Sequence, residues 1–501
     1  MRFRGKIIAA LLGGAALGAP AMATTLQDAF VQTYNSSPAL NAARAQLRGT
    51  DEGVSIAKAG SRLQVSGTVG LSQSTNGIDN FSNGARVLTA QANLSYPLFQ
   101  GGRVKNAINA ATSRVTAGRA DLRTTEGNLF VQVVSAYMDV IRDASIVDLN
   151  RKNVDVLNTN LKASRDRFQV GDLTRTDVAQ SEARLSLARS QLIAAQGNLT
   201  ASRENYRRVV GSWPENLEQP PALPKLPQDP DQAVATALDN SPAIQAAAAD
   251  TKAAEYDVKS ARSQRLPTLS AVSGPNYNNF LGAAYRYAGV PKDSPAAGQL
   301  PNSQSANTFG VQMTVPLYQG GLAGARVRQA QAAQSVAVES GIDTERQVIA
   351  TTRAALASYE AAVAGISANQ EAVKANELAL EGVRAENRVG TRTVLDVLNA
   401  EQELLNSQVQ LVSAQHDQYV AGFALLNAMG MAEARDLGLD GGALYDPTAN
   451  YNHVTRWLGD WSEQPKYAPK GTHTTGPTPT DNDVVPYNPD AANGAVTPPQ
   501  Q

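Results

Sequence analysis

The chain contains the same structural unit twice, at one fixed spacing. The segment YPLFQGGR at residues 96–103 returns as VPLYQGGL at residues 315–322, and VGDLTRTDV at residues 170–178 is answered by VGTRTVLDV at residues 389–397. Pro97 and Pro316 are 219 positions apart, and so are Gly171 and Gly390. Self-similarity at a fixed period indicates a repeated architecture, so the fold must be built from two equivalent halves.

A third pair of matching segments shows where the halves differ. SSPALNAA at residues 36–43 returns as NSPAIQAA at residues 240–247, and Pro38 and Pro242 are only 204 positions apart. The second copy therefore holds a 15-residue insertion between Pro242 and Pro316. The Tyr-, Asn-, Pro- and Gly-rich stretch at about 276–307 is where we expect this insertion, as a long surface loop.

These landmarks divide the chain into a first repeat at residues 24–225 and a second at 226–435. Residues 1–23 combine a basic start, an apolar run and a small-residue end at Ala23, which predicts an export signal peptide. The alternative is a retained membrane anchor, for which the apolar run is short. Residues 436–501 are rich in Pro, Thr and Asn without a hydrophobic period, which predicts a disordered tail.

The composition excludes several classes of function. There are 44 Lys and Arg against 45 Asp and Glu, so the charge gives no reason to expect nucleic acid as a partner. The chain has no cysteine, and its three histidines are scattered, so we expect no metal site and no cofactor. Because no nucleophile stands in a recognisable catalytic context and there is no phosphate-binding loop, we do not expect an enzyme.

Long helices are predicted by two matched runs without proline, at residues 98–213 and 317–446. They are expected at about 103–170 and 322–389, with returning helices at about 174–210 and 393–430. Apolar residues recur every seven positions, as at Val115, Leu122 and Leu129, which is typical of a coiled coil. A helix of about 67 residues would reach roughly 100 Å. By itself this pattern also fits a soluble rod that only spaces other parts.

Strands are predicted before each Gly-Gly pair, at about 62–73, 86–97, 266–274 and 308–316. Apolar residues there alternate with Ser, Thr, Gln and Asn, and the lengths are close to those of strands that cross a bilayer. For any single segment a soluble sheet fits equally well, but four segments and an export signal favour the membrane. Since four strands leave open edges, closure must be shared between chains, and two or three copies would both suffice.

The repeated junction motif, the VGTRTVLDV tip and the duplicated Ser-Pro-Ala segment together resemble the TolC family of outer-membrane factors from Gram-negative bacteria. The resemblance covers residues 26–431 and implies an α+β membrane protein. It implies a homotrimer with a twelve-stranded β-barrel in outer-membrane lipid and an α-helical coiled-coil tunnel in the periplasm. The lack of cysteine resembles the unlipidated branch, and the tip and Pro-rich tail resemble the type I secretion branch.

The resemblance also implies the function and the partners. Such proteins are the outer-membrane exit duct of tripartite export, conducting secreted proteins or drugs from a periplasmic adaptor and an inner-membrane ABC or RND-type transporter. A secreted coiled-coil adhesin without a pore and a periplasmic adaptor are the alternatives. Adaptors carry one helical hairpin, so the duplication argues against the second of these.

Glycine and proline mark the expected junction between strand and helix. Proline removes a donor from the strand ladder, and paired glycines let the chain turn into the helix. Phe99 and Tyr318 then stand where an aromatic belt at the membrane boundary is expected. The junction residues are Pro97, Gly101, Gly102, Pro316, Gly320 and Gly321.

The resemblance places a periplasmic gate at the second-copy tip. Asp396 matches an entrance aspartate, and Arg392 matches the arginine of a constraining network. Asn399 stands where many relatives carry a second aspartate, and Asn387 where a tyrosine is usual, so one ring of three carboxylates is expected. Asp177 is the first-copy equivalent of Asp396, and a helix cap explains it as well as a gating role does.

The turns between the long helices are the expected docking surface for the adaptor, because glycine at an exposed turn allows close approach of a partner backbone. The tip residues are Val170, Gly171, Thr174, Val389, Gly390, Thr391 and Thr393.

Overall fold

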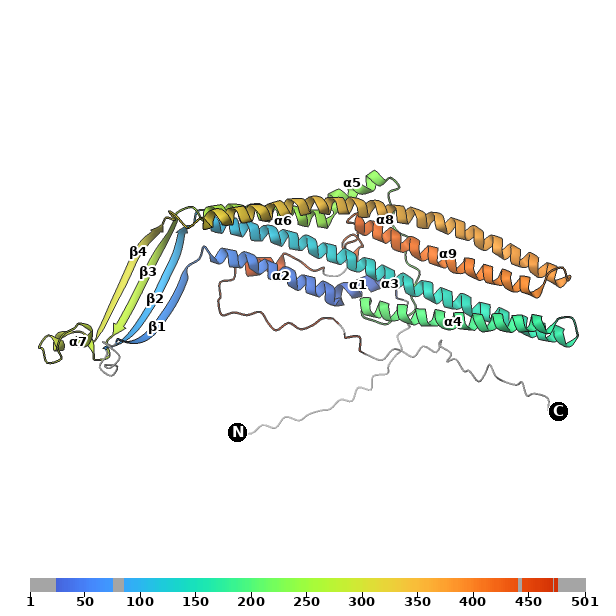
Figure 1. Cartoon of the computed structure of the whole chain (residues 1–501), viewed down its shortest axis with the longest axis horizontal. Helices are drawn as coiled ribbons and strands as arrows, with labels where there is room; N and C mark the ends of the chain where they lie inside the picture. The colour runs from blue at the N-terminus through green and yellow to red at the C-terminus, as the bar shows by residue number, and fades with distance from the viewer. Residues whose placement is uncertain (1–23, 75–84, 440–443, 472, 476–501) are drawn as a thin grey trace, which may run out of the picture.

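The computed structural model describes residues 24–74, 85–439, 444–471 and 473–475, so the expected signal peptide lies outside the described residues. The molecule is elongated, with a sheet at one end and long helices running away from it (Figure 1). Among the described residues, no helix combines the length and the apolar character needed to cross a membrane.

The two repeats have the same order of elements. The first contains α1 (Leu26–Ser36), α2 (Pro38–Ala59), β1 (Gln64–Ser74), β2 (Ala85–Phe99), α3 (Arg103–Gln169) and α4 (Arg175–Val210). The second contains α5 (Pro230–Asn240), α6 (Pro242–Ser263), β3 (Thr268–Asn279), β4 (Ser303–Thr314), α8 (Leu322–Arg388) and α9 (Val394–Ala428). The predicted two-fold repeat of a β-hairpin and a long helical hairpin is confirmed (Figure 1).

The duplicated Ser-Pro motif starts the helix that leads into each hairpin. Ser37 and Ser241 are the N-caps of α2 and α6, and proline follows at the first helical position in both. Proline is suited to that position because the missing N–H would have no partner within the helix.

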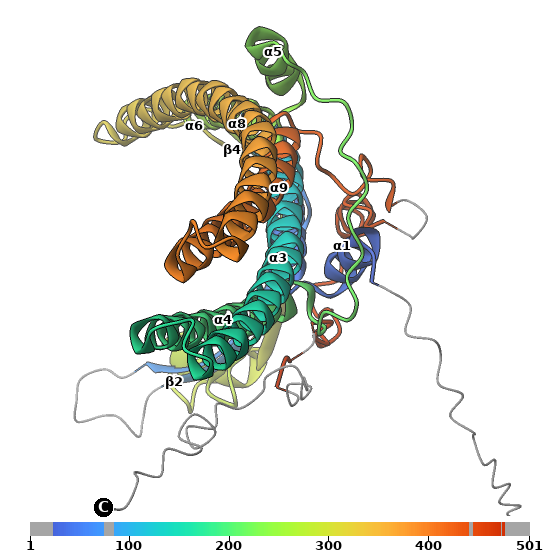
Figure 2. The same cartoon turned by 90° about the vertical axis from the view of Figure 1, so that its right-hand side faces the viewer.

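The long helices α3 and α8 each contain 67 residues. Glycines with positive φ start and stop them: Gly102 and Gly321 are the N-caps, at 82° and 83°, and Gly171 and Gly390 follow the last turns, at 80° and 82°. Seen end-on, α4, α3, α9, α8 and α6 form a curved wall, with α1 and α5 outside it (Figure 2). The wall of a single chain is therefore an open arc.

The four strands form one antiparallel sheet in the order β1-β2-β3-β4. The outer edges of β1 and β4 have no partner strand among the described residues. Phe309, Val311 and Met313 alternate along β4 and are 65–75% exposed, so the apolar face of the sheet is uncovered in the single chain. An apolar face and two open edges require a partner or a lipid environment.

The expected insertion loop is shorter than predicted, because β3 and β4 extend into it. Residues 276–279 pair with residues 303–306, which leaves a connection at 280–302 that contains α7 (Ala284–Tyr287) and the 3₁₀ turn η2 (Ala297–Gln299). The Asn- and Pro-containing end of β3 has a loop-like composition, but its backbone hydrogen bonds to β4 hold it as a strand.

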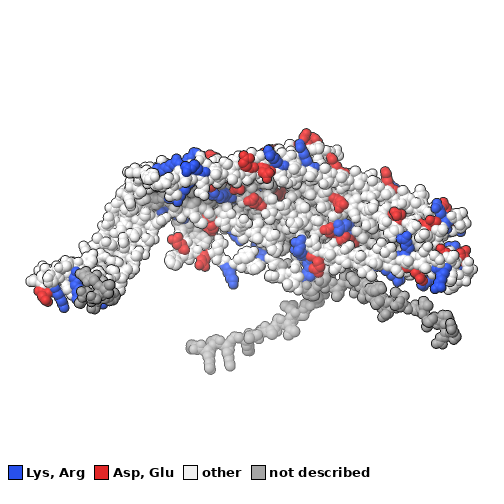
Figure 3. Space-filling view, in the orientation of Figure 1, with Lys and Arg blue, Asp and Glu red and all other residues white. Residues whose placement is uncertain are grey.

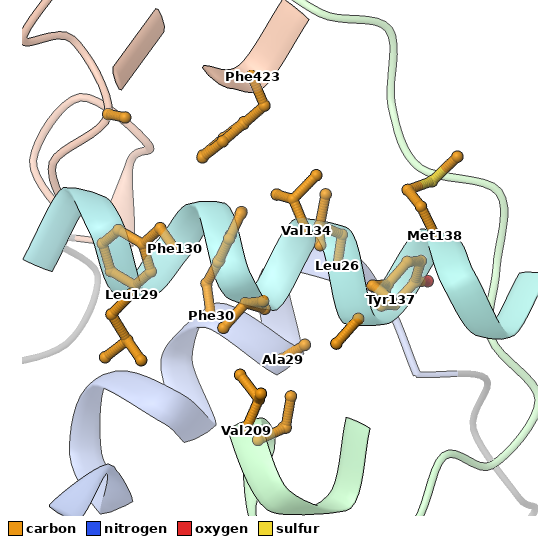
Figure 4. Packing of buried hydrophobic residues seen from close by; sticks show 14 of the residues in the cluster. Leu26, Ala29, Phe30, Leu129, Phe130, Val134, Tyr137, Met138, Val209 and Phe423 are labelled. Carbon is orange, nitrogen blue, oxygen red and sulfur yellow. The ribbon is translucent and has the colours of Figure 1, made fainter. Parts of the chain in front are cut away.

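The largest core lies around the middle of the helical part, where α1 packs against the long helices (Figure 4). The ring of Phe30 is 5.0 Å from that of Phe130 in α3 and 5.7 Å from that of Phe423 in α9. The single hydroxyl proton of the buried Tyr137 is shared between the carbonyl oxygens of Thr24, at 2.9 Å, and Glu218, at 2.7 Å. This core joins both repeats.

The prediction of a disordered tail is wrong for the part of the tail that is described. Residues 444–471, called here the C-terminal segment, contain α10 (Ala449–Val454), and α10 packs on α2. Val454 is 1% exposed, Asn450 donates to Asp51 at 2.8 Å, and Ser55 donates to the Val454 carbonyl at 2.8 Å. These anchors are single side chains rather than a periodic stripe, so hydrophobic periodicity did not reveal them.

Candidate functional site: the helical tips

The two helical tips have the same local structure. Thr174 caps α4 and Thr393 caps α9, each in a reciprocal arrangement with the aspartate three residues later. In both tips the threonine hydroxyl donates to the aspartate at 2.7 Å and the threonine N–H donates to it at 2.9 Å. Asp177 and Asp396 are therefore equivalent members of the two capping boxes within the chain.

These contacts hold both aspartates in the charged form. The Thr393 hydroxyl, followed by its backbone N–H, lowers the pKa of Asp396 below the ordinary value of 3.8. Thr174 lowers the pKa of Asp177 in the same way. Capping explains the position of Asp396 in one chain, so any additional gating role must arise where several chains meet.

Arg392 and Asn387 make their contacts inside the α8–α9 tip. Arg392 Nε donates to Glu386 Oε2 at 2.8 Å, and this pairing raises the pKa of Arg392. Asn387 Nδ2 donates to the Arg392 carbonyl at 2.8 Å. Together the two contacts fix the turn that presents Arg392.

A buried carboxylate joins the two helical hairpins behind the tip. Glu401 of α9 is 5% exposed. Asn160 Nδ2 of α3 donates to its two carboxylate oxygens at 2.8 and 2.9 Å, and Arg384 of α8 donates to Oε1 at 2.9 Å. One side chain thus connects three long helices.

A second contact joins the hairpins closer to the tip. Arg184 Nη2 of α4 donates to Asn399 Oδ1 of α9 at 2.6 Å. Asn399, expected at the gate, therefore contacts the neighbouring hairpin of its own chain. Asn399 and Glu401 thus add polar contacts to the apolar packing of Leu398 that also joins the two hairpins here.

Sequence reasoning missed Glu401, Asn160, Arg384 and Arg184. The sequence did contain a signal for Glu401, because this residue lies on the apolar stripe of α9. It follows the buried Leu398 by three residues and precedes the buried Leu405 by four. A charged residue on an apolar helical stripe indicates a specific polar partner. The identity of that partner required the packing of α9 on α3.

The tip valines are exposed as a docking surface requires. Val170 is 81% exposed and Val389 is 76% exposed, and each precedes a glycine that leaves open space above the turn. Apolar side chains presented on exposed turns are suited to contact with another protein.

At the opposite end, the glycines behave as the sequence indicated, but the prolines differ. Gly101 and Gly320 have φ of 59° and 58°. Pro97 lies inside β2 rather than at its end, because an irregularity in the register between Pro97 and Phe99 lets the strand continue. Pro316 follows the end of β4.

Within the described residues, no three His, Asp or Glu side chains are placed to bind a metal ion.

The chain matches the family model described as outer membrane efflux protein, over residues 30–212 and 233–431. It is similar to the outer membrane efflux protein BepC of Brucella suis, with 38% identity over 90% of this chain and 95% of the relative. It is also similar to the outer membrane protein TolC of Vibrio cholerae, with 25% identity over 86% of this chain and 95% of the relative. Among solved structures, that of VceC from Vibrio cholerae matches with a TM-score of 0.68 and 24% identity, over 81% of this chain and 96% of that chain.

Proposed function

This chain belongs to the outer membrane efflux protein family, and on that premise we propose that three copies of it close into one continuous channel. As a member, it is the outer-membrane exit duct of a tripartite export system, with its helical part in the periplasm. The open sheet edges and the open arc of helices support the shared closure (Figure 2). Three copies of a four-stranded sheet give twelve strands, an even number within the range of closed barrels.

The periplasmic entrance is the proposed gate, formed by the α8–α9 tips of the three chains. Asp396 supplies a ring of three carboxylates, and Arg392 is presented to the neighbouring chain by its contacts with Glu386 and Asn387. The contacts of Glu401 and Asn399 hold each α8–α9 hairpin against α3 and α4. Opening then requires these contacts to loosen.

The partners are a periplasmic adaptor and an inner-membrane pump, which supply the energy that the duct lacks. The exposed turns at Val170-Gly171 and Val389-Gly390 are the proposed docking points for the adaptor. The pump is of the ABC or RND type, and the duct passively conducts the secreted proteins or drugs that it delivers.

Planar-bilayer recording tests the gate with a matched pair of variants. Asp396→Ala and Asp177→Ala remove the same carboxylate of the capping box from equivalent tips. We expect the channel to be cation-selective and blocked by multivalent cations, because a ring of carboxylates in a narrow mouth attracts them. Asp396→Ala is expected to weaken both properties, and Asp177→Ala to leave them near those of the unmodified protein.

The comparison separates gating from capping. Equal effects of the two variants would show that the cap alone matters, and an unchanged Asp396→Ala channel would remove this residue from the gate.

A further inference from the structure

The C-terminal segment reaches the level of the strand-to-helix junction. Gln100, which follows the last residue of β2, donates to the Gly60 carbonyl at 3.2 Å. Arg62 lies two residues after Gly60, and its Nη1 donates to the Trp457 carbonyl at 3.3 Å. Figure 1 shows the segment beside the end of α2 that faces the sheet, before it turns back along the helices. Trp457 therefore lies at the level where the sheet begins.

Beyond this contact the segment presents apolar side chains to the surroundings. Leu458 is 73% exposed and Trp461 is fully exposed, at 100%. Trp461 is four residues from Trp457, so its backbone lies within about 14 Å of that contact even if the chain is extended. A fully exposed tryptophan has no packing role in the single chain, and tryptophan is enriched where apolar lipid meets water.

Positive charge gathers at the same level. The stretches 53–62, 100–120, 258–267 and 317–338, which flank the sheet in sequence, contain no Asp or Glu. Exposed arginines stand there at the end of α6 and the start of α8, while the sheet surface is almost free of charge up to its far end (Figure 3). These arginines are Arg262, Arg265, Arg326 and Arg328. Guanidinium groups beside an uncharged sheet are complementary to a layer of lipid phosphates.

We propose that the C-terminal segment anchors the duct to the membrane surface, with Leu458 and Trp461 inserted in the phospholipid headgroup layer on the periplasmic side. The occupant of this surface is lipid, because Trp461 closely follows the contact with Arg62, in the turn between α2 and β1, and the cations beneath the uncharged sheet match headgroup phosphates. The exposed Asp460 and Glu463, on either side of Trp461, remain on the water side of that layer. The anchor fixes the height of the helical part relative to the membrane. The inference rests on the proposed placement of the sheet in the bilayer.

Tryptophan fluorescence of the full chain, reconstituted in phospholipid vesicles, tests the anchor. The chain has three tryptophans, so Trp213→Phe with Trp457→Phe leaves Trp461 as the only reporter. We expect its emission to be blue-shifted and to lose more intensity to phospholipid brominated near the headgroup than to aqueous iodide.

Two control variants make the outcome specific. Trp457→Phe with Trp461→Phe leaves Trp213, which follows the 36-residue α4 and so lies about 45 Å from the junction along the 67-residue α3. Its emission is expected to be unaffected by bromolipid. Val69→Trp, in a chain with all three tryptophans changed to phenylalanine, places a reporter on the apolar face of β1, where Val69 is 75% exposed.

Quenching of Val69→Trp by bromolipid without quenching of Trp461 would overturn the anchor and leave the channel intact. Protection of Trp461 from both quenchers would also overturn it, since the side chain would then pack against a second copy. If Val69→Trp is itself insensitive to bromolipid, the placement of the sheet in the membrane is wrong.

Discussion

A single buried carboxylate, Glu401, makes a polar connection between the two helical hairpins. Its partners come from the other hairpin and from its own, so the bond opposes any outward movement of the α8–α9 pair. The Arg384 side chain is 42% exposed and can turn to water when the carboxylate is removed, whereas Asn160 is more confined. Loss of the charge should therefore loosen the connection without leaving a buried cation.

Glu401→Gln is expected to increase the open probability of the channel in bilayer recordings. The substitution keeps the size of the side chain and weakens hydrogen bonds to a charged group, which contribute about 1.5–3 kcal/mol. Glu403→Gln, two residues away on the exposed side, is the matched control and should behave as the unmodified protein. A lower melting temperature with unchanged conductance would make the connection structural only.

Residues at the tip show how far sequence reasoning could go. The motif located Asp396 and Arg392 in the turn because glycine and threonine fix that turn locally. It could not identify Asn160 as the partner of Glu401, since these residues are 241 positions apart and meet only when two helices pack.

At the scale of elements, the two strand-to-helix junctions have the same backbone but different surroundings. Gly101 and Gly320 have nearly equal positive φ, of 59° and 58°. A Cβ on Gly101 would lie 2.7 Å from the Leu266 Cβ, whereas a Cβ on Gly320 would meet nothing within 4 Å in the described chain.

Gly101→Ala is therefore expected to destabilise the protein more than Gly320→Ala. Both variants bear the cost of a left-handed alanine, about 1 kcal/mol, and only the first adds a steric clash. The melting temperature of each purified variant, followed by circular dichroism, measures the difference. A larger loss for Gly320→Ala would mean that a neighbouring chain packs closely on that junction.

Elements bounded by proline and glycine were predicted to within a few residues, because those residues act on the local backbone. The extended end of β3 and the packing of α10 were missed for the opposite reason. Asn276–Asn279 are strand only because β4 pairs with them, and Val454 is buried only because α2 lies nearby.

At the scale of the whole molecule, the open edges of the sheet set the assembly. Thr68 of β1 pairs with Gln91, Gln91 pairs with Asn276, and Asn276 pairs with Ala306 of β4. Directly paired residues point to the same face, so Thr68 and Ala306 share one face of the sheet. Thr308, Gly310 and Gln312 share that face, because side chains alternate along a strand. A β1 edge that pairs with the β4 edge of the next chain would bring these positions together.

Cysteine cross-linking tests this closure without background, since the chain has no cysteine of its own. Thr68→Cys combined in turn with Thr308→Cys, Gly310→Cys and Gln312→Cys should yield a covalent trimer in at least one combination. Thr68→Cys with Phe309→Cys, on the opposite face, should not cross-link. Products no larger than a covalent dimer would favour a barrel of eight strands. Products that contain more than three linked chains would contradict a closed ring of three chains.

The equal lengths of α3 and α8 have a consequence for how such a protein can evolve. Seven residues inserted into one long helix would displace its tip by about 10 Å relative to the other. The mouth of the duct would then be uneven, and a single partner could not seat on both turns. A change in the length of the long helices must therefore arise in both halves of the gene and in both helices of each hairpin. This requirement makes the length of the duct resistant to gradual change.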